Sequence, residues 1–261
     1  MKRNSLSITA ALLILLSSLF TPLTATAKTH IYLMAGQSNM MGKGKTARLP
    51  ATYKKTPANI QFFYQGRPRK LAQFAFFGPE VSFAHAIARA YPNDTHIIIK
   101  YVATGSSIRQ WLPGQRLYQG LLKQLQLMKL PEDAQLEAVV WMQGEKDARQ
   151  RQTAMQYESN LKHFIKALRN DLNAPQSDFI MGKINPDDKA FAMKKIVQQA
   201  QNNIQQTLPH TTVISTRGLG KIFDHVHYDA KGQIELGKRF ARAYVLNNQH
   251  KIVSANWQKN R

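Results

Sequence analysis

The chain has 261 residues, no cysteine, and 36 Lys and Arg against 15 Asp and Glu, so its formal charge at pH 7 is +21. The absence of cysteine excludes thiol catalysis, cysteine metal ligands and disulfides, and leaves stability to packing alone. A surface this basic attracts polyanions, and it indicates an environment rather than a particular chemistry.

The N-terminal segment has the pattern of a secretory signal peptide. Lys2 and Arg3 precede an apolar run over residues 8–20, and the small residues that follow suit cleavage after Ala27. The run is shorter than the roughly 20 residues of a membrane-spanning helix, although a retained N-terminal anchor is the alternative. We expect residues 1–27 to be removed on export, which leaves a periplasmic or extracellular protein without stable membrane insertion. Its polyanionic partners would then be acidic polysaccharide, lipopolysaccharide or anionic membrane rather than nucleic acid.

Residues 28–261 contain no linker, internal repeat or low-complexity segment, so we expect one domain. Short apolar or β-branched runs predict five strands, over residues 30–35, 96–103, 136–142, 178–184 and 211–215. Helical spacing of apolar residues predicts helices over 80–91, 157–168, 193–204 and 232–245. This alternation predicts an α/β fold, a three-layer α/β/α sandwich with a five-stranded parallel sheet. The segment 43–73 breaks the alternation, and we expect a long surface excursion beside the site with a short strand over 59–64.

Small and polar residues follow three successive predicted strands. Residues 36–39 (Gly-Gln-Ser-Asn) come after the first, 104–107 (Thr-Gly-Ser-Ser) after the second, and 143–147 (Gln-Gly-Glu-Lys-Asp) after the third. Asp224 and His227 lie past the fifth strand. Because open α/β sheets bind ligands beyond the carboxyl ends of their strands, we expect the chemistry to converge on one edge of the sheet.

Ser38 is the predicted nucleophile at this edge. A serine hydroxyl attacks an acyl carbon only when a neighbouring imidazole takes its proton, and His227 is the predicted base. Asp224, three positions earlier, would accept the Nδ1 proton of His227 and stabilise the imidazolium, with Asp229 as the alternative partner. The alternative for Ser38 is a turn serine that only binds the backbone.

Donors for the oxyanion of a tetrahedral intermediate are available on the same loops. We expect the backbone amides of Ser38 and Gly105 and the side-chain amide of Gln143 to surround this oxygen. An ordinary loop glycine and a buried amide that braces the loops are the alternatives for the last two. Glu145 is expected to hold neighbouring loops in place rather than to form a glycosidase pair or a hard-metal site with Asp147.

Three competing motifs are weaker. Asp224, His225 and His227 suggest part of a metal site, but no third nitrogen ligand is placed by the sequence, so we expect no metal. The glycines from residue 36 to 44 have the wrong spacing for a phosphate-binding loop and lack its Ser or Thr. Met40 stands where a Gly-x-Ser-x-Gly elbow has its second glycine, which argues against an α/β-hydrolase fold.

Taken together, these blocks resemble the SGNH hydrolases, and within them the sialate O-acetylesterase-like branch grouped with the acetylxylan esterases of carbohydrate esterase family 6. The matching blocks span most of the chain in order: Ala35–Met40, Phe77–Ala84, Thr104–Ile108 with Trp111, Trp141–Asp147 and Asp224–Asp229. Thr104 is a departure, because relatives often carry glycine there. Gln143 replaces the asparagine of the wider superfamily, although the sialate branch commonly has glutamine.

The resemblance implies a flavodoxin-like fold, a Ser38–His227–Asp224 triad, an oxyanion hole from Ser38, Gly105 and Gln143, and no cofactor. It also implies removal of acetyl groups from sugar hydroxyls through an acetyl-enzyme on Ser38. Supporting or substrate-binding positions would be Gln37, Asn39, Glu80, Ser106, Arg109, Trp111 and Glu145. Trp111 would stack on a sugar face and Arg109 would meet a carboxylate, with core packing and plain solvation as the alternatives.

The sequence therefore predicts an exported serine esterase that acts on acetylated polysaccharide or a sialic-acid-type sugar. Two other interpretations remain open. A non-catalytic binder of acidic glycans would explain the charge without turnover. A lipid or aryl esterase would keep the triad and change the pocket, although no long apolar lid segment favours it.

Overall fold

The computed structural model describes residues 27–259; the predicted signal peptide, apart from Ala27, lies outside them. The main sheet has seven strands in the order β4-β3-β6-β1-β7-β8-β9. These are β1 (Thr29–Gly36), β3 (Ile60–Tyr64), β4 (Arg67–Arg69), β6 (Thr95–Val102), β7 (Gln135–Met142), β8 (Asp178–Gly182) and β9 (Thr211–Ile214). A second, two-stranded sheet pairs β2 (Gly44–Lys45) with β5 (Phe76–Phe77).

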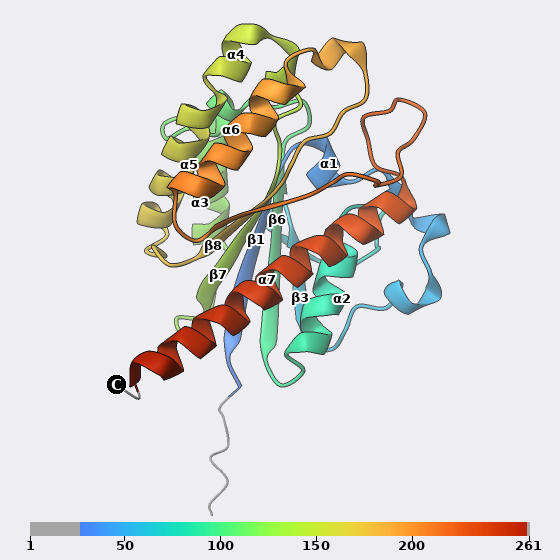
Figure 1. Cartoon of the computed structure of the whole chain (residues 1–261). Coiled ribbons are helices and arrows are strands. Elements are labelled where there is room, and N and C mark those ends of the chain that lie inside the picture. Colours follow the sequence, from blue (N-terminus) through green and yellow to red (C-terminus); the bar gives the residue numbers. More distant parts are fainter. Residues whose placement is uncertain (1–26, 260–261) are drawn as a thin grey trace, which may run out of the picture.

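Helices cover both faces of the main sheet. Figure 1 shows α2 and α7 side by side on one face, and α3, α5 and α6 on the other. The helices are α1 (Ser38–Met41), α2 (Glu80–Ala90), α3 (Arg116–Leu127), α4 (Arg151–Met155), α5 (Tyr157–Asp171), α6 (Lys194–Thr207) and α7 (Ala230–Lys259). The predicted three-layer α/β/α sandwich is thus confirmed. Within the described part of the chain, none of the helices has both the length and the apolar character needed to cross a bilayer.

The five predicted strands are present and parallel, in the order β6-β1-β7-β8-β9. Numbered along the chain this is 2-1-3-4-5, the flavodoxin-like order, whose ligand site lies where the strand order reverses beside β1. The short strand predicted over residues 59–64 is also present, as β3. The count of five for the sheet is wrong, because β3 adds parallel to β6 and β4 adds antiparallel to β3. The Arg-Pro-Arg sequence of β4 carries no strand pattern, and its proline is tolerated because the strand lies at the sheet edge.

The four predicted helices are confirmed with shifted ends, and α7 continues well past residue 245, where its predicted range ends. The crossover helix α3 was not predicted. Its Tyr118 and Leu121 are buried, and Leu117, Leu122 and Leu125 pack partly against the core. These positions follow helical spacing, so the signal was present in the sequence.

A cluster of titratable residues lies at the amino ends of the strands, away from the predicted site. The His30 ring bonds Glu137 through Nδ1 (2.8 Å) and Asp94 through Nε2 (3.1 Å), and it stacks on the His96 ring. The Glu137 hydrogen bond, helped by Asp94, raises the pKa of His30 above its ordinary value against the opposing effect of burial. Burial works to raise the pKa of Glu137, but the hydrogen bond and charge of His30 hold it below its ordinary value. The Tyr244 hydroxyl donates to the second oxygen of Glu137.

This cluster predicts a pH-dependent part of stability. Because the pKa of His30 is raised in the fold, its protonated form stabilises the protein at pH values below the ordinary histidine pKa of 6.5. This stabilisation is lost as pH rises through the raised pKa. Ionised Glu137 stabilises the fold at pH values above its ordinary pKa of 4.5, and this stabilisation is lost as pH falls through the lowered pKa. We expect His30→Gln to lower the free energy of unfolding by about 1 kcal/mol between pH 4.5 and 6.5, and by less toward pH 9.

Urea unfolding of parent and variant across this pH range measures the difference. The exposed His163→Gln change is the control and should show no such dependence. A His30→Gln difference that does not vary with pH would contradict the assigned role.

Candidate active site

The end of β1 brings Ser38 to the sheet edge. Gly36 has φ +140°, and a Cβ there would lie 2.1 Å from the Met142 carbonyl oxygen, so only glycine lets β1 lie this close to β7. The next amide, that of Gln37, donates to the same carbonyl at 2.9 Å. The chain then turns into the single-turn helix α1, which begins at Ser38. The hydroxyl is thereby presented at the carboxyl end of the sheet, as predicted.

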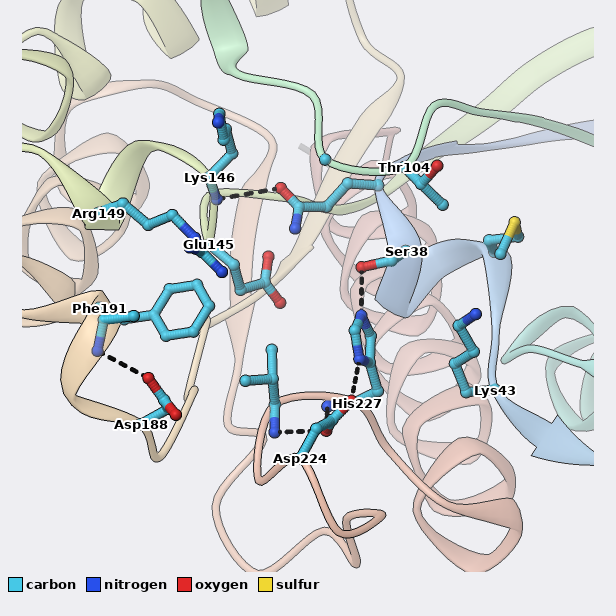
Figure 2. Close-up of a pocket in the computed structure, with 15 residues that line it drawn as sticks. Ser38, Lys43, Thr104, Glu145, Lys146, Arg149, Asp188, Phe191, Asp224 and His227 are labelled. Atoms are coloured by element: carbon cyan, nitrogen blue, oxygen red, sulfur yellow. Dashed lines mark hydrogen bonds and ion pairs between the residues drawn. The ribbon is translucent and has the colours of Figure 1, made fainter.

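The loop between β9 and α7 carries the predicted base and its predicted acid partner. His227 Nε2 lies 2.8 Å from Ser38 Oγ, and His227 Nδ1 lies 2.6 Å from an oxygen of Asp224. Figure 2 shows this hydrogen-bonded chain from Ser38 through His227 to Asp224. The three side chains meet although Ser38 and His227 are 189 positions apart. Asp229, the alternative partner, instead accepts the Gly232 amide at the start of α7.

Asp224 is held in place by its own loop. Its Oδ1 accepts the amides of Val226 and His227, both at 2.9 Å, which leaves Oδ2 for the imidazole. Partial burial works to raise the pKa of Asp224, but the hydrogen bonds from the His227 ring and from the two amides outweigh it and hold this pKa below its ordinary value. Asp224 is therefore a stable anion that fixes the imidazole with Nδ1 protonated and Nε2 free to accept from the serine.

Two backbone amides are available beside the nucleophile. Ser38 and Gly105 both line the pocket, and neither amide donates a hydrogen bond to another of the described residues. Ser38 is the first residue of α1, where helical amides have no partner within the helix. Gly105 has φ +66° with open space around its Cβ position, so glycine serves the backbone conformation there. Both predicted backbone donors are thus unpaired at the pocket wall.

Gln143 does not fit the predicted third donor. Its side chain is fully buried, and its Nε2 donates to the Ser106 carbonyl at 2.9 Å and to Asp147 Oδ2 at 2.6 Å. Both N–H groups are therefore used. Asp147 also accepts from the Ser107 hydroxyl and the Ile108 amide. Gln143 and Asp147 together brace the loop that carries Gly105, which is the alternative that the sequence left open.

Gln37 is the glutamine whose side chain lines the pocket. Its Oε1 accepts long hydrogen bonds from the amides of Gly144 (3.5 Å) and Lys146 (3.4 Å), so this end of the side chain faces the loop after β7. The opposite end, Nε2, donates to no other described residue and is left for a group in the pocket. Gln37 therefore lies at the pocket, and its supporting or substrate-binding role stays a prediction.

Asn39 and Glu145 join helix α1, the loop after β7 and the loop that carries His227. This is the role predicted for Glu145. The Asn39 amide donates to Glu145 at 2.7 Å and to the Val226 carbonyl at 3.2 Å, and its oxygen accepts the Tyr228 amide at 3.2 Å. Burial raises the pKa of Glu145, against the hydrogen bond from Asn39. These contacts hold helix α1 against the loop that carries His227, so they set the distance from Ser38 to His227.

Glu80 and Ser106, two further predicted supporting residues, bond other groups of the protein. Glu80 accepts the Gly78 amide and forms a buried ion pair with Lys100. The Ser106 hydroxyl donates to the Ala103 carbonyl and accepts the Trp111 indole N–H. Both residues therefore hold loops at the sheet edge, and neither lines the pocket that contains Ser38.

The predictions for Trp111 and Arg109 are not supported. Trp111 is fully buried and packs edge-to-face on Tyr101 and Trp141, so it belongs to the core and cannot stack on a sugar. Arg109 is exposed and lines none of the pockets found in the described residues that border Ser38 or Gly105. Core packing and solvation, the alternatives stated for these residues, describe them instead.

The site opens into a pocket of about 690 Å³. Besides the predicted residues it is lined by Lys43, Lys146 and Arg149, and by Phe191, over whose ring the Arg149 guanidinium lies at 4.5 Å. Figure 2 shows these side chains around the triad. Phe191 lies in a short 3-10 helix (Lys189–Phe191) well past the end of β8, so the residues directly after the fourth predicted strand did not indicate it. Within residues 27–259 no group of three or more His, Asp or Glu side chains is arranged to hold a metal ion.

Comparison with known proteins identifies the family. A family model described as "Carbohydrate esterase, sialic acid-specific acetylesterase" matches residues 28–246. The chain belongs to this carbohydrate esterase family. As a member, it is a carboxylic ester hydrolase. The predicted resemblance to the sialate O-acetylesterase-like branch is confirmed.

Relatives of this carbohydrate esterase agree in sequence and fold. A "probable carbohydrate esterase" of Arabidopsis thaliana is 26% identical over 242 residues, which cover 84% of this chain and 91% of that protein. Its solved structure superimposes with a TM-score of 0.75 at 23% identity, over 84% of this chain and 98% of that one. NanS gives a TM-score of 0.69 at 15% identity, over 87% and 99% of the two chains. A Xanthomonas citri protein described as a carbohydrate acetylesterase gives 0.64 at 19% identity, over 81% of this chain and 54% of that one.

Proposed function

We propose that this carbohydrate esterase removes O-acetyl groups from sugar hydroxyls through an acetyl-enzyme on Ser38. The observation that supports the proposal most is the continuous hydrogen-bonded chain Ser38 Oγ–His227–Asp224, with distances of 2.8 and 2.6 Å. It lies beside the two unpaired amides of Ser38 and Gly105 in one pocket. A nucleophile, a base, an oriented acid and oxyanion donors are the parts that acyl transfer requires.

In the proposed reaction, His227 Nε2 takes the Ser38 proton as Oγ bonds to the acetyl carbonyl carbon. The carbonyl oxygen becomes an oxyanion that accepts from the Ser38 and Gly105 amides, and Gln37 Nε2 is a further side-chain donor available in this pocket. The imidazolium, stabilised by Asp224, then protonates the sugar oxygen as the ester bond breaks. Water deprotonated by His227 attacks the acetyl-enzyme, and the proton returns to Ser38 as acetate leaves.

The location and the substrate are part of the same proposal. The leader-like residues 1–27 support export to the periplasm or beyond. There, acetylated polysaccharide or a sialic-acid-type sugar would be the substrate. The formal charge of +21 suits a polymer that also carries acidic groups.

Acetate release tests the proposal against the alternative of a glycan binder. Purified protein is incubated with acetylated xylan, acetylated pectin and O-acetylated sialic acid, and released acetate is measured beside salt-dependent binding to the deacetylated polymers. We expect release from at least one substrate and labelling of Ser38 by a serine-directed fluorophosphonate. Binding without release or labelling would reject the esterase and leave the binder.

Activity should depend on pH in one direction. The proposed base accepts a proton only as neutral imidazole, so hydrolysis of p-nitrophenyl acetate is expected to rise between about pH 5 and 8. Initial rates in buffers of constant ionic strength measure the profile. A flat profile over this range would count against His227 as the base.

A further inference from the structure

A second pocket, of about 320 Å³, adjoins the candidate active site. Met41 and Lys43 line both pockets, so the two are neighbours at the end of α1. The second pocket is formed largely by the excursion between β2 and α2, which the sequence predicted to lie beside the site. Nothing in the proposed deacetylation uses it.

Aromatic side chains dominate its wall. Phe74 and Phe76 are 43% and 49% exposed, which places them among the few large apolar side chains open to solvent in the described residues. The Tyr64 ring lies 5.5 Å from that of Phe74 at an angle of 58°. Apolar surface left uncovered around a concavity is typical of a binding site, because folding alone would bury it.

The floor of this pocket is rigid and is connected to the nucleophile helix. Lys100 Nζ donates to Glu80 at 2.6 Å and to the Met41 carbonyl at 2.7 Å, and it lies 5.7 Å from the Tyr64 ring centre. Both charges are buried, and a buried pair keeps its geometry because breaking it would strand a charge. Because Met41 ends α1, a ligand on this floor is held at a fixed position relative to Ser38.

We propose that the second pocket binds a further sugar ring of an oligosaccharide whose acetylated ring lies at Ser38. A pyranose presents an apolar C–H face that packs on aromatic rings such as Phe74 and Phe76. Its hydroxyls accept hydrogen bonds from ammonium groups, and Lys43 and Lys70 line the same pocket. A lipid acyl chain would use the aromatic wall but would not use these lysines. The inference rests on the proposed function, and it predicts that the esterase prefers oligosaccharides to single sugars.

Binding energy from a remote ring raises kcat/KM for the longer substrate when it holds the reacting group in place. We expect the parent to prefer acetylated xylo- or galacturono-oligosaccharides over the corresponding acetylated monosaccharides by about tenfold or more. The double change Phe74→Ala and Phe76→Ala should remove about tenfold of kcat/KM on the oligosaccharides, which corresponds to about 1.4 kcal/mol. It should leave p-nitrophenyl acetate and the monosaccharides unchanged.

The control is Leu127→Ala, which removes a side chain 69% exposed at the end of α3, far along the chain from this pocket. It should change none of the three substrate classes. An unchanged rate on oligosaccharides in the double variant would overturn the subsite, and so would an equal loss on all substrates. A loss confined to long-chain acyl esters of p-nitrophenol would assign the pocket to an acyl chain instead, and the proposal would fail.

Two measurements keep the inference separate from the proposed function. Turnover of p-nitrophenyl acetate by a Ser38→Ala variant would sink the mechanism whatever the phenylalanines do. If no acetylated oligosaccharide is turned over, the subsite is tested by calorimetry instead. Binding of the unmodified oligosaccharides is measured for the parent and for the double variant. Equal binding by both, or no binding at millimolar sugar, overturns the subsite.

Discussion

Replacing Ser38 with alanine is expected to lower kcat for acetyl ester hydrolysis by at least about 10⁴-fold. The proposed mechanism has no other group that could carry the acetyl, because among the described residues Ser38 is the one whose hydroxyl bonds the proposed base, at 2.8 Å. The oxyanion donors of the backbone remain in the variant, so a small residual rate above that of water is expected. Initial rates on p-nitrophenyl acetate and on an acetylated glycan measure the loss.

Ser159→Ala is the matched control, because it removes an exposed hydroxyl on α5 that, within residues 27–259, bonds just the nearby Gln156 carbonyl. It should keep the parent rate. Urea unfolding of both variants excludes loss of the fold as the cause. A Ser38→Ala rate within tenfold of the parent would reject the acetyl-enzyme.

The second large effect is expected from Asp224→Asn, which should lower kcat by about 10⁴-fold. The asparagine oxygen can still accept the amides of Val226 and His227, so the loop keeps its shape. Its NH₂ group, however, then faces His227 Nδ1 and favours the tautomer that carries its proton on Nε2. That nitrogen can no longer accept the proton of Ser38.

Asp229→Asn is the control for this change, because Asp229 caps α7 through the Gly232 amide and asparagine caps helices equally well. It should retain parental activity and stability. If Asp224→Asn stays within tenfold of the parent, another carboxylate orients the imidazole. Glu145 is then the group to change next, because one of its oxygens is buried and accepts no hydrogen bond from the described residues.

Much of the fold follows from local pattern. The five parallel strands are apolar runs ending in glycine or polar residues, and their alternation with amphipathic helices leaves few arrangements other than a doubly covered sheet. The edge strand β4 is different. It lies in a segment rich in lysine, arginine and proline, and it is a strand only because β3, which the sequence predicted, offers it a ladder. Such pairing depends on neighbours in space, which local pattern does not contain.

For the site, placement at the strand ends was predictable and side-chain direction was not. Ser38, Asp224 and His227 come together because the carboxyl ends of parallel strands share one edge. Trp111 and Gln143 lie on the predicted loops, yet their side chains point away from the pocket. Their directions are set by Trp141 and by Asp147, partners that only the packed structure brings into contact.

The contacts of Asn39 with Val226 and Tyr228 join the two far ends of the domain. During synthesis, the ribosome therefore releases the proposed nucleophile long before the proposed acid and base. Under the proposed mechanism, a growing polypeptide has no esterase activity until residues 224–227 have emerged, and a product that terminates before position 224 has none.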